Sequence, residues 1–386
     1  MTSSRGRKPP FVLATALCLV PILAVAATAP PQPKTGPGGS EATHAKVVSA
    51  TFGSGAKAYS IFEPADPAPE QAPVVVFLHG WSAMDPRAYG SWIDHLVRRG
   101  NIVIYPRYQD SLRTPVRDFT PNALAAVKDA LARLGSEPSH VRPDLGKFAL
   151  AGHSMGGVLA ANLAALASSS GLPAPRAVLA AEPGKTWAES GSIAVHLEDL
   201  GRIPKDTLLV TIAGDADTLA RDIDAKKIFH GATSIPPENR NMVRMRSDDH
   251  GSPPLDATHY APVAPGADFA EGATSPVAAA PAGGAAANSA APQAGTFRER
   301  MRERIRQRLS ARREASGSSE GQSAAPMRGV DALDFYGTWK LLDALTDAAF
   351  FGKNREYALG NTPQQRFMGT WSDGVAVKEL EVTTGP

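Results

Sequence analysis

The sequence predicts an α/β fold, in which helices cover both faces of a mostly parallel, twisted sheet. The prediction rests on short apolar, β-branched runs, on longer segments with helical periodicity, and on the alternation of the two along the chain. The chain has 386 residues, 43% of them hydrophobic, so it can bury one large core. The apolar runs that predict the central strands lie at 73–79, 101–105, 148–151, 177–181, 208–213 and 242–245.

The remaining elements follow from periodicity and from the residues that begin or end each segment. Residues 47–52 and 57–62 alternate between apolar and polar, as antiparallel strands do. Helical spacing predicts helices at 89–98, at 121–134 with Thr120 as its N-cap, and at about 156–167. A closing helix is predicted after residue 330, where one helical face gathers Leu333, Tyr336, Trp339, Leu342 and Leu345.

One motif predicts nucleophilic catalysis. The run Gly152-His153-Ser154-Met155-Gly156 matches G-x-S-x-G, the pattern of a sharp strand-to-helix turn that exposes its serine. Small residues two before and two after the serine let the strand and the helix approach closely. Here the motif follows a buried strand and opens an alanine-rich helix, which is the context such a turn requires. We therefore expect Ser154 to be a nucleophile.

A serine nucleophile needs a base and an orienting carboxylate, which follow this kind of turn in the order acid, then histidine. Asp217 is the preferred acid, because it lies on the loop after strand 208–213 and three residues beyond its glycine. Asp215 is the alternative, and Glu182, after the preceding strand, is less favoured. The competing interpretation of each is a solvated loop carboxylate or a helix N-cap.

Two histidines follow the last predicted strand. His259 lies in a compact turn beside Tyr260 and is the preferred base, whereas His250 lies nearer the strand end and is the alternative. We expect the backbone N–H groups of Trp81 and Met155 to form the oxyanion hole, and their side chains to line an acyl pocket. Packing of Trp81 against the sheet edge is the competing interpretation.

With these residues placed, the sequence resembles the α/β-hydrolase superfamily, and within it the bacterial cutinase and polyester-hydrolase (dienelactone-hydrolase-like) branch. The likeness spans about residues 70–262 and is carried by the glycine-rich turn around Ser154, the loop ending at Asp217-Thr218, and the turn at 258–262. The resemblance implies a Ser-Asp-His triad, and a substrate cleft lined by Trp81, Trp187 and Tyr260. The family's C-terminal disulfide is missing, because Cys18 is the only cysteine.

The N-terminus has the features of a secretory signal. Basic residues precede an apolar run at 11–27, and Ala24-Val25-Ala26 supplies a cleavage site, so we expect a signal peptide at 1–27 and export to the periplasm or the medium. An uncleaved membrane anchor is the alternative. Residues 28–45 are rich in Pro, Gly and Thr and predict a flexible tether.

The predicted hydrolase core spans 46–261 and resumes at 330–386. Between them, 262–329 is an Ala/Pro/Gly-rich, disordered insertion with a basic amphipathic helix at 297–313. That helix could lie on an anionic membrane surface, the alternative being a solvated helix. The formal charge of +2 indicates no nucleic-acid partner.

Taken together, the sequence predicts an exported serine hydrolase that cleaves carboxylic esters. The segment 181–207 is too short for a large cap domain, so an open cleft suited to lipid-like, bulky or polymeric esters is expected. An amidase or peptidase, or a non-catalytic binding protein, are the alternatives. No glycine-rich phosphate loop or metal-ligand cluster is present, so neither a metal nor an organic cofactor is predicted. The sequence does not indicate an oligomeric state.

Overall fold

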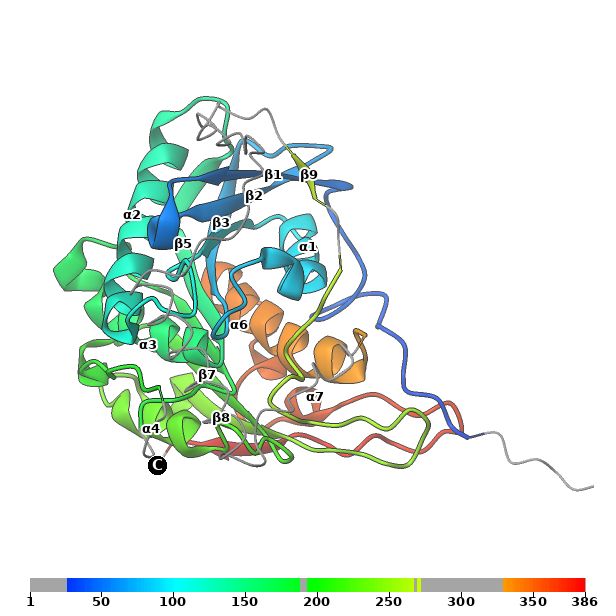
Figure 1. The fold of residues 1–386 in the computed structure, drawn as a ribbon. Helices are drawn as coiled ribbons and strands as arrows, with labels where there is room; N and C mark the ends of the chain where they lie inside the picture. The colour runs from blue at the N-terminus through cyan, green and yellow to red at the C-terminus, as the bar shows by residue number, and fades with distance from the viewer. Residues whose placement is uncertain (1–25, 188–192, 267–268, 272–328, 386) are drawn as a thin grey trace, which may run out of the picture.

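A computed structural model describes residues 26–187, 193–266, 269–271 and 329–385 (Figure 1). Most of the predicted insertion, including the helix at 297–313, and the predicted signal peptide up to residue 25 lie outside the described residues. The described strands are β1 (Lys46–Phe52), β2 (Tyr59–Ala65), β3 (Gln71–Leu78), β4 (Ile102–Pro106), β5 (Arg142–His153), β6 (Ala177–Ala181), β7 (Leu208–Gly214), β8 (Arg240–Met245), β9 (Ala270–Glu271) and β10 (Glu381–Thr384).

Within the described residues these strands form one sheet in the order β10-β8-β7-β6-β5-β3-β4-β2-β1-β9. The six strands from β3 to β8 pair in parallel, while β2 runs antiparallel to both β1 and β4. At one edge the short β10 pairs antiparallel with β8, and at the other the short β9 pairs with β1. The predicted mostly parallel sheet is therefore confirmed.

Helices cover both faces of this sheet (Figure 1). The longer ones are α1 (Gly90–Arg98), α2 (Phe119–Ser136), α3 (Met155–Ser170), α4 (Ile223–Gly231) and α6 (Lys340–Phe351), with α7 (Pro363–Arg366) a single turn. Helices α2, α3 and α4 pack on one face, and α1 and α6 pack on the other. Short 3₁₀ turns lie at Gly55–Lys57, Pro86–Tyr89, Val116–Asp118, Leu200–Arg202, Pro237–Asn239 and Arg355–Tyr357. No helix in the described ranges combines the length and apolar character that a membrane crossing needs.

The predicted start of α2 was wrong. The helix begins at Phe119, directly after the 3₁₀ turn Val116–Asp118, so Thr120 lies inside it and does not cap it. The Thr120 hydroxyl instead accepts a hydrogen bond from the Asn162 amide at 3.2 Å. Because the chain is already helical at Thr120, the hydroxyl of this residue links α2 to α3 and does not cap α2.

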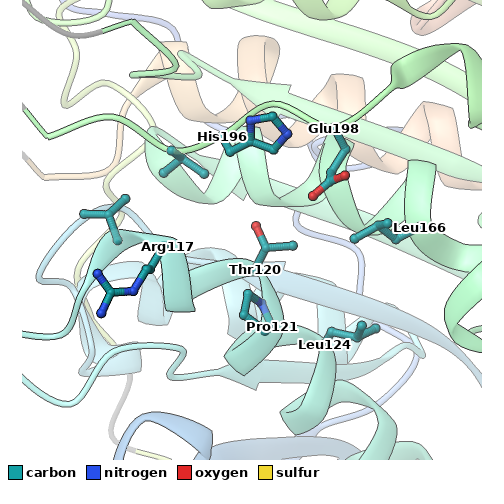
Figure 2. A pocket seen from close by; sticks show the side chains of 9 residues that line it. Arg117, Thr120, Pro121, Leu124, Leu166, His196 and Glu198 are labelled. Atoms are coloured by element: carbon teal, nitrogen blue, oxygen red, sulfur yellow. The ribbon is translucent and has the colours of Figure 1, made fainter.

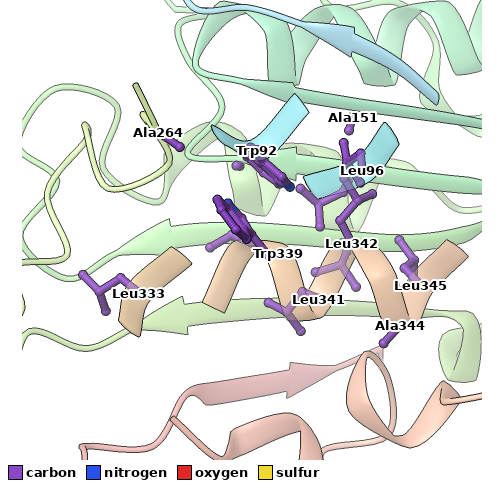
Figure 3. Close-up of a cluster of buried hydrophobic side chains, with 14 of the residues drawn as sticks. Trp92, Leu96, Ala151, Ala264, Leu333, Trp339, Leu341, Leu342, Ala344 and Leu345 are labelled. Atoms are coloured by element: carbon purple, nitrogen blue, oxygen red, sulfur yellow. The ribbon is translucent and has the colours of Figure 1, made fainter. Parts of the chain in front are cut away.

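The closing helix packs as its periodicity predicts. Trp339, Leu342 and the other apolar residues of its face are buried, except that Tyr336 is half-buried and donates its hydroxyl to the carbonyl of Pro31. Figure 3 shows Trp92 and Leu96 of α1 facing Trp339 and Leu342 across this core. The first turns, Leu333–Trp339, form a π-helix that continues into α6.

Residues 26–45, termed here the N-terminal strap, are packed on the domain and do not form the predicted tether. The Gly38 N–H donates to Asp343 Oδ2 at 2.8 Å, and Thr28 exchanges two hydrogen bonds with Ser372. Gly38 has φ +78°, and a Cβ there would come within 1.9 Å of a carbonyl oxygen, so only glycine fits. The Pro, Gly and Thr content of this segment gives no sign of these hydrogen bonds, because their partners lie more than 300 residues away in the sequence.

Asp343 is also the centre of a buried ionic cluster beneath the strap. Its Oδ2 lies 2.7 Å from His95 Nε2 and 3.2 Å from Arg99 Nε. The His95 ring stacks on Trp339 with centroids 4.7 Å apart. Burial opposes ionisation of Asp343, but the charges of His95 and Arg99 outweigh it and hold the pKa of the carboxyl below its ordinary value.

Replacing Asp343 by asparagine is expected to lower the free energy of unfolding by about 1.5–3 kcal/mol, because it removes the charge that faces buried His95 and leaves half-buried Arg99 with only Asp347, 3.6 Å away. Because the pKa of Asp343 is depressed in the folded state, its contribution is present above about pH 4 and is lost as the pH falls further. Urea unfolding at pH 7 measures the loss, with the more exposed Asp94→Asn as control. Equal stability of the two variants would contradict this account.

Candidate active site

Ser154 lies in the sharp turn between β5 and α3, with φ 56° and ψ −125°. This sparsely populated conformation costs on the order of 1–3 kcal/mol and is typical of functional sites. A Cβ on Gly152 would lie 2.2 Å from the Gly156 carbonyl oxygen, and one on Gly156 would lie 1.9 Å from that of Leu78. Both glycines are therefore required for the strand and the helix to approach so closely.

The structure brings Ser154, His259 and Asp217 into one hydrogen-bonded array. His259 Nε2 lies 2.9 Å from Ser154 Oγ, and His259 Nδ1 lies 2.8 Å from Asp217 Oδ2. Because an ionised carboxylate only accepts, the Nδ1–H donates to Asp217 and leaves Nε2 to accept the serine proton. The three residues come from the turn after β5, the loop after β7 and the chain beyond β8.

Asp217 is held ionised by its surroundings. Burial opposes ionisation, but the hydrogen bond and charge of His259 and the backbone N–H groups of Leu219 and Ala220 keep its pKa below the ordinary value. Asp217 therefore remains a carboxylate, the form that accepts the His259 Nδ1–H, through the weakly acidic range.

The two alternative residues lie outside this array. Asp215 accepts hydrogen bonds from the backbone and hydroxyl of Ser247, at 2.9 and 2.6 Å, and pairs with Arg246. His250 pairs with the exposed Asp373 at 2.7 Å and lies beside Trp371. Asp215 therefore fixes a loop, and His250 lies at the surface.

We expect His250→Ala to leave kcat/KM for any substrate of this site within about threefold, because its contacts are at the surface. His259→Ala, in contrast, removes the imidazole that contacts Ser154. Steady-state assays of both variants measure the difference. A large loss in His250→Ala together with an active His259→Ala would reverse the assignment of the base.

Glu182, the less favoured acid, does lie in the site. It follows β6, is fully buried, and has its Oε2 4.0 Å from His259 Nδ1. Asp217 is closer by more than 1 Å and, of the two carboxyl groups, it is the one that is hydrogen-bonded to the imidazole. Glu182 adds a second carboxylate beside the same nitrogen.

The loop His79-Gly80-Trp81 lies against Ser154, because a Cβ on Gly80 would be 3.4 Å from Ser154 Cβ. His79 is buried between Tyr105 and Tyr108, and burial lowers its pKa to about 4, so it is neutral near pH 7. Trp81 therefore follows a rigid turn. Met155 is the first residue of α3, where backbone N–H groups lack partners within the helix.

The three aromatic residues predicted to bind substrate differ in their exposure and contacts. Trp81 is 39% exposed and Tyr260 is 46% exposed, and the Tyr260 ring contacts that of His259. The Trp187 indole is half-buried and lies 4.7 Å from Lys185 Nζ and 4.9 Å from the Arg221 guanidinium, both cation–π contacts. The predicted role of these three residues in substrate binding remains a prediction.

A cavity of about 300 Å³ lies between α2, α3 and the segment 195–198 (Figure 2). Buried Asn162 fixes this segment by donating to the His196 carbonyl and accepting from the Glu198 N–H. None of the array lines this cavity, so it is separate from the candidate site. Its lining residues are Val116, Arg117, Thr120, Pro121, Leu124, Leu166, Val195, His196 and Glu198.

One group of side chains among the described residues is arranged so that it could hold a metal ion. One ligand atom each from His153, Glu182 and His259 lie within 4.8 Å of one another. Both ring nitrogens of His153 already have hydrogen-bond partners, and His259 contacts Ser154 and Asp217. A metal there would have to replace these bonds.

The strand order and the strained serine turn define the α/β-hydrolase fold. Residues 36–188 match the family model Chlorophyllase, an α/β-hydrolase-type family, and this match indicates an esterase-type hydrolase. The matched span includes the loop with Trp81 and the turn with Ser154, and ends before Asp217 and His259. A search of curated proteins finds no match.

Proposed function

We propose that this protein is an exported serine esterase that cleaves carboxylic esters through Ser154, His259 and Asp217. The observation that carries the proposal is the continuous array from Ser154 Oγ to His259 at 2.9 Å and from His259 to Asp217 at 2.8 Å. Ser154 lies on a strained turn between strand and helix, the position of the nucleophile in this kind of motif.

In the first half-reaction, His259 Nε2 takes the hydroxyl proton as Ser154 Oγ attacks the ester carbonyl. Asp217 holds the Nδ1–H tautomer and stabilises the imidazolium that forms. The backbone N–H groups of Trp81 and Met155 would bind the negative charge on the tetrahedral oxygen, each donor being worth about 3–4 kcal/mol. His259 then protonates the leaving alcohol.

In the second half-reaction, water hydrolyses the acyl-enzyme. His259 removes a proton from the water, a second tetrahedral oxyanion forms at the same donors, and the Ser154 oxygen leaves with the proton. No step in this cycle uses a metal or an organic cofactor.

Bulky or lipid-like esters are the proposed substrates, as in the cutinases that the sequence resembles. Trp81 and Tyr260 are both exposed, with the Tyr260 ring against that of His259, and the sequence between β6 and β7, residues 182–207, is too short for a large cap domain. The name of the matched family, Chlorophyllase, also favours an ester substrate. The same triad could cleave amides, so an amidase or peptidase is the second candidate.

Export is part of this proposal and is supported by the basic, apolar and small-residue pattern at 1–27. Contact with a membrane surface through 297–313 also remains a proposal from the sequence. N-terminal sequencing of the protein recovered from the cell exterior or periplasm tests cleavage near Ala26. Intact protein with residue 1 in the membrane fraction would favour an anchor.

The experiment that tests the function is hydrolysis of para-nitrophenyl esters from acetate to palmitate, beside a matched para-nitroanilide. A serine-directed fluorophosphonate probe reports the nucleophile independently of the substrate chosen. We expect ester hydrolysis and labelling, both absent in Ser154→Ala. Hydrolysis of the anilide alone would favour the amidase, and a folded protein that neither turns over nor labels would refute the proposal.

A further inference from the structure

A second chain of buried hydrogen bonds connects the loop of Trp81 to the backbone of His259. The Gly80 N–H lies 2.9 Å from the Tyr89 hydroxyl oxygen, which in turn lies 2.8 Å from His153 Nδ1. His153 Nε2 lies 2.7 Å from the His259 carbonyl oxygen. The Tyr89 and His153 side chains and the His259 residue are all buried.

The chemistry of its two ends fixes the direction of this chain. A backbone N–H only donates, so the Tyr89 oxygen accepts from Gly80 and gives its own proton to His153 Nδ1. A backbone carbonyl only accepts, so His153 Nε2 carries the ring proton and donates to His259. Each side chain thus has one donor and one acceptor role, and His153 has a single allowed tautomer.

Both side chains are neutral. Burial, assisted by the charge of His259, lowers the pKa of His153 to about 3, and burial raises the pKa of the Tyr89 hydroxyl. Protonation of His153 would give both ring nitrogens a hydrogen, and Nδ1 could then no longer accept from Tyr89. Because His153 stays neutral at pH 7, this hydrogen-bond chain is intact at that pH.

His153 is also the last residue of β5 and directly precedes Ser154. The central strand therefore fixes its position, whereas His259 lies in a loop well beyond β8. Sites of this kind need their groups held within about 0.5 Å, because a displacement of 1 Å can cost about 100-fold in rate. The hydrogen-bond chain thus connects both the loop of His259 and the loop of Gly80-Trp81 to β5, the strand that ends directly before Ser154.

We propose that Tyr89 and His153 are positioning residues that set His259 and the Gly80-Trp81 backbone relative to Ser154, an inference that rests on the proposed function. Neither side chain reacts. This hydrogen-bond chain from Gly80 through Tyr89 and His153 to His259, termed here the relay, affects the geometry of the transition state. Its loss therefore lowers kcat and leaves KM nearly unchanged.

Tyr89→Phe removes one oxygen atom and keeps the ring. We expect kcat for para-nitrophenyl butyrate to fall about 10- to 100-fold, with a similar fall in the rate of fluorophosphonate labelling. The matched control is Tyr59→Phe, because Tyr59 is also a buried tyrosine whose hydroxyl donates a hydrogen bond, to Asp129 at 2.6 Å, and it takes no part in the hydrogen-bond chain from Gly80 to His259. We expect the control to stay within about threefold of wild type.

Substitutions of His153 test the relay at its second position. In His153→Gln a side-chain amide can still donate to the His259 carbonyl, whereas His153→Phe retains bulk and loses both hydrogen bonds. We expect the glutamine variant to be the more active of the two. These variants keep the test decisive if Tyr89→Phe does not fold.

Nitrogen NMR of the histidine rings gives a readout that is independent of turnover. At pH 7 the wild-type His153 is expected in the Nε2–H tautomer, and an Nδ1–H tautomer or an imidazolium would overturn the relay. Equal kcat values in Tyr89→Phe and Tyr59→Phe would also overturn it, while the esterase proposal would stand. A wild-type protein that does not label would refute the proposed function, and the positioning role with it.

Discussion

Replacing Ser154 by alanine is expected to lower kcat for ester hydrolysis by about 10⁵- to 10⁶-fold, the loss typical when a nucleophile of such an array is removed. His259 and Asp217 remain in the variant but have no hydroxyl to activate. Spectrophotometric assays of ester hydrolysis at high enzyme concentration measure the residual rate of the variant. Thermal unfolding should show a folded protein, because alanine keeps the Cβ and removes only the hydroxyl oxygen, which lies 2.9 Å from His259 Nε2 and 3.5 Å from the Gly184 carbonyl oxygen.

The control for this substitution is Ser169→Ala, which removes the same atom from the exposed end of α3. Its activity should match that of the wild type. An equal rate in Ser154→Ala and wild type would refute the assignment of the nucleophile, and would place the chemistry elsewhere on the molecule.

Asp217→Asn is expected to lower kcat by about 10³- to 10⁴-fold with little change in KM. An asparagine amide can donate to His259 Nδ1, which would favour the tautomer with its proton on Nε2. That proton would face Ser154 Oγ, and the imidazole could not act as a base. Stabilisation of the imidazolium by the Asp217 carboxylate, 2.8 Å away, would also be lost.

Two variants calibrate this result. Asp215→Asn should retain near wild-type kcat, because Asp215 contacts Ser247 and Arg246. Glu182→Gln should lose less activity than Asp217→Asn, because Glu182 lies 4.0 Å from the same nitrogen. A greater loss in Glu182→Gln would make Glu182 the orienting acid, and a greater loss in Asp215→Asn would require a different loop conformation.

The central part of the fold could be predicted because its signals are local. The apolar runs at 177–181 and 208–213 correspond to β6 and β7 almost to the residue, since a strand buried on both faces needs apolar residues throughout. The start of β5 was missed, by contrast. This strand begins at Arg142, and its first residues are polar, so they give no apolar signal although they pair with β3. The turn at Ser154 was predictable because its five-residue pattern is local, although the carbonyl that Gly156 approaches belongs to Leu78 on the neighbouring strand β3.

Other features depend on contacts that no local pattern records. Tyr89 and His153 are 64 residues apart, and the His153 ring contacts a carbonyl 106 residues away. In the sequence Tyr89 appears only as the start of a predicted helix, and His153 only as the variable position of a motif. The preference for Asp217 over Asp215 depended on loop length. Chain order left Glu182 as a less favoured acid, and it did not indicate that both Glu182 and Asp217 would lie beside His259 Nδ1.

The docking of the N-terminal strap has a consequence for the order of biosynthesis. The strap is made before the rest of the domain, yet Gly38 and Thr28 bond to residues 305 and 344 positions later in the chain. A ribosome-bound chain that lacks α6 and β10 therefore cannot complete its core or close the edge at β8. Native structure should form after release of the full chain, and removal of the last fifty residues should yield aggregation-prone protein, because long-range closure comes last.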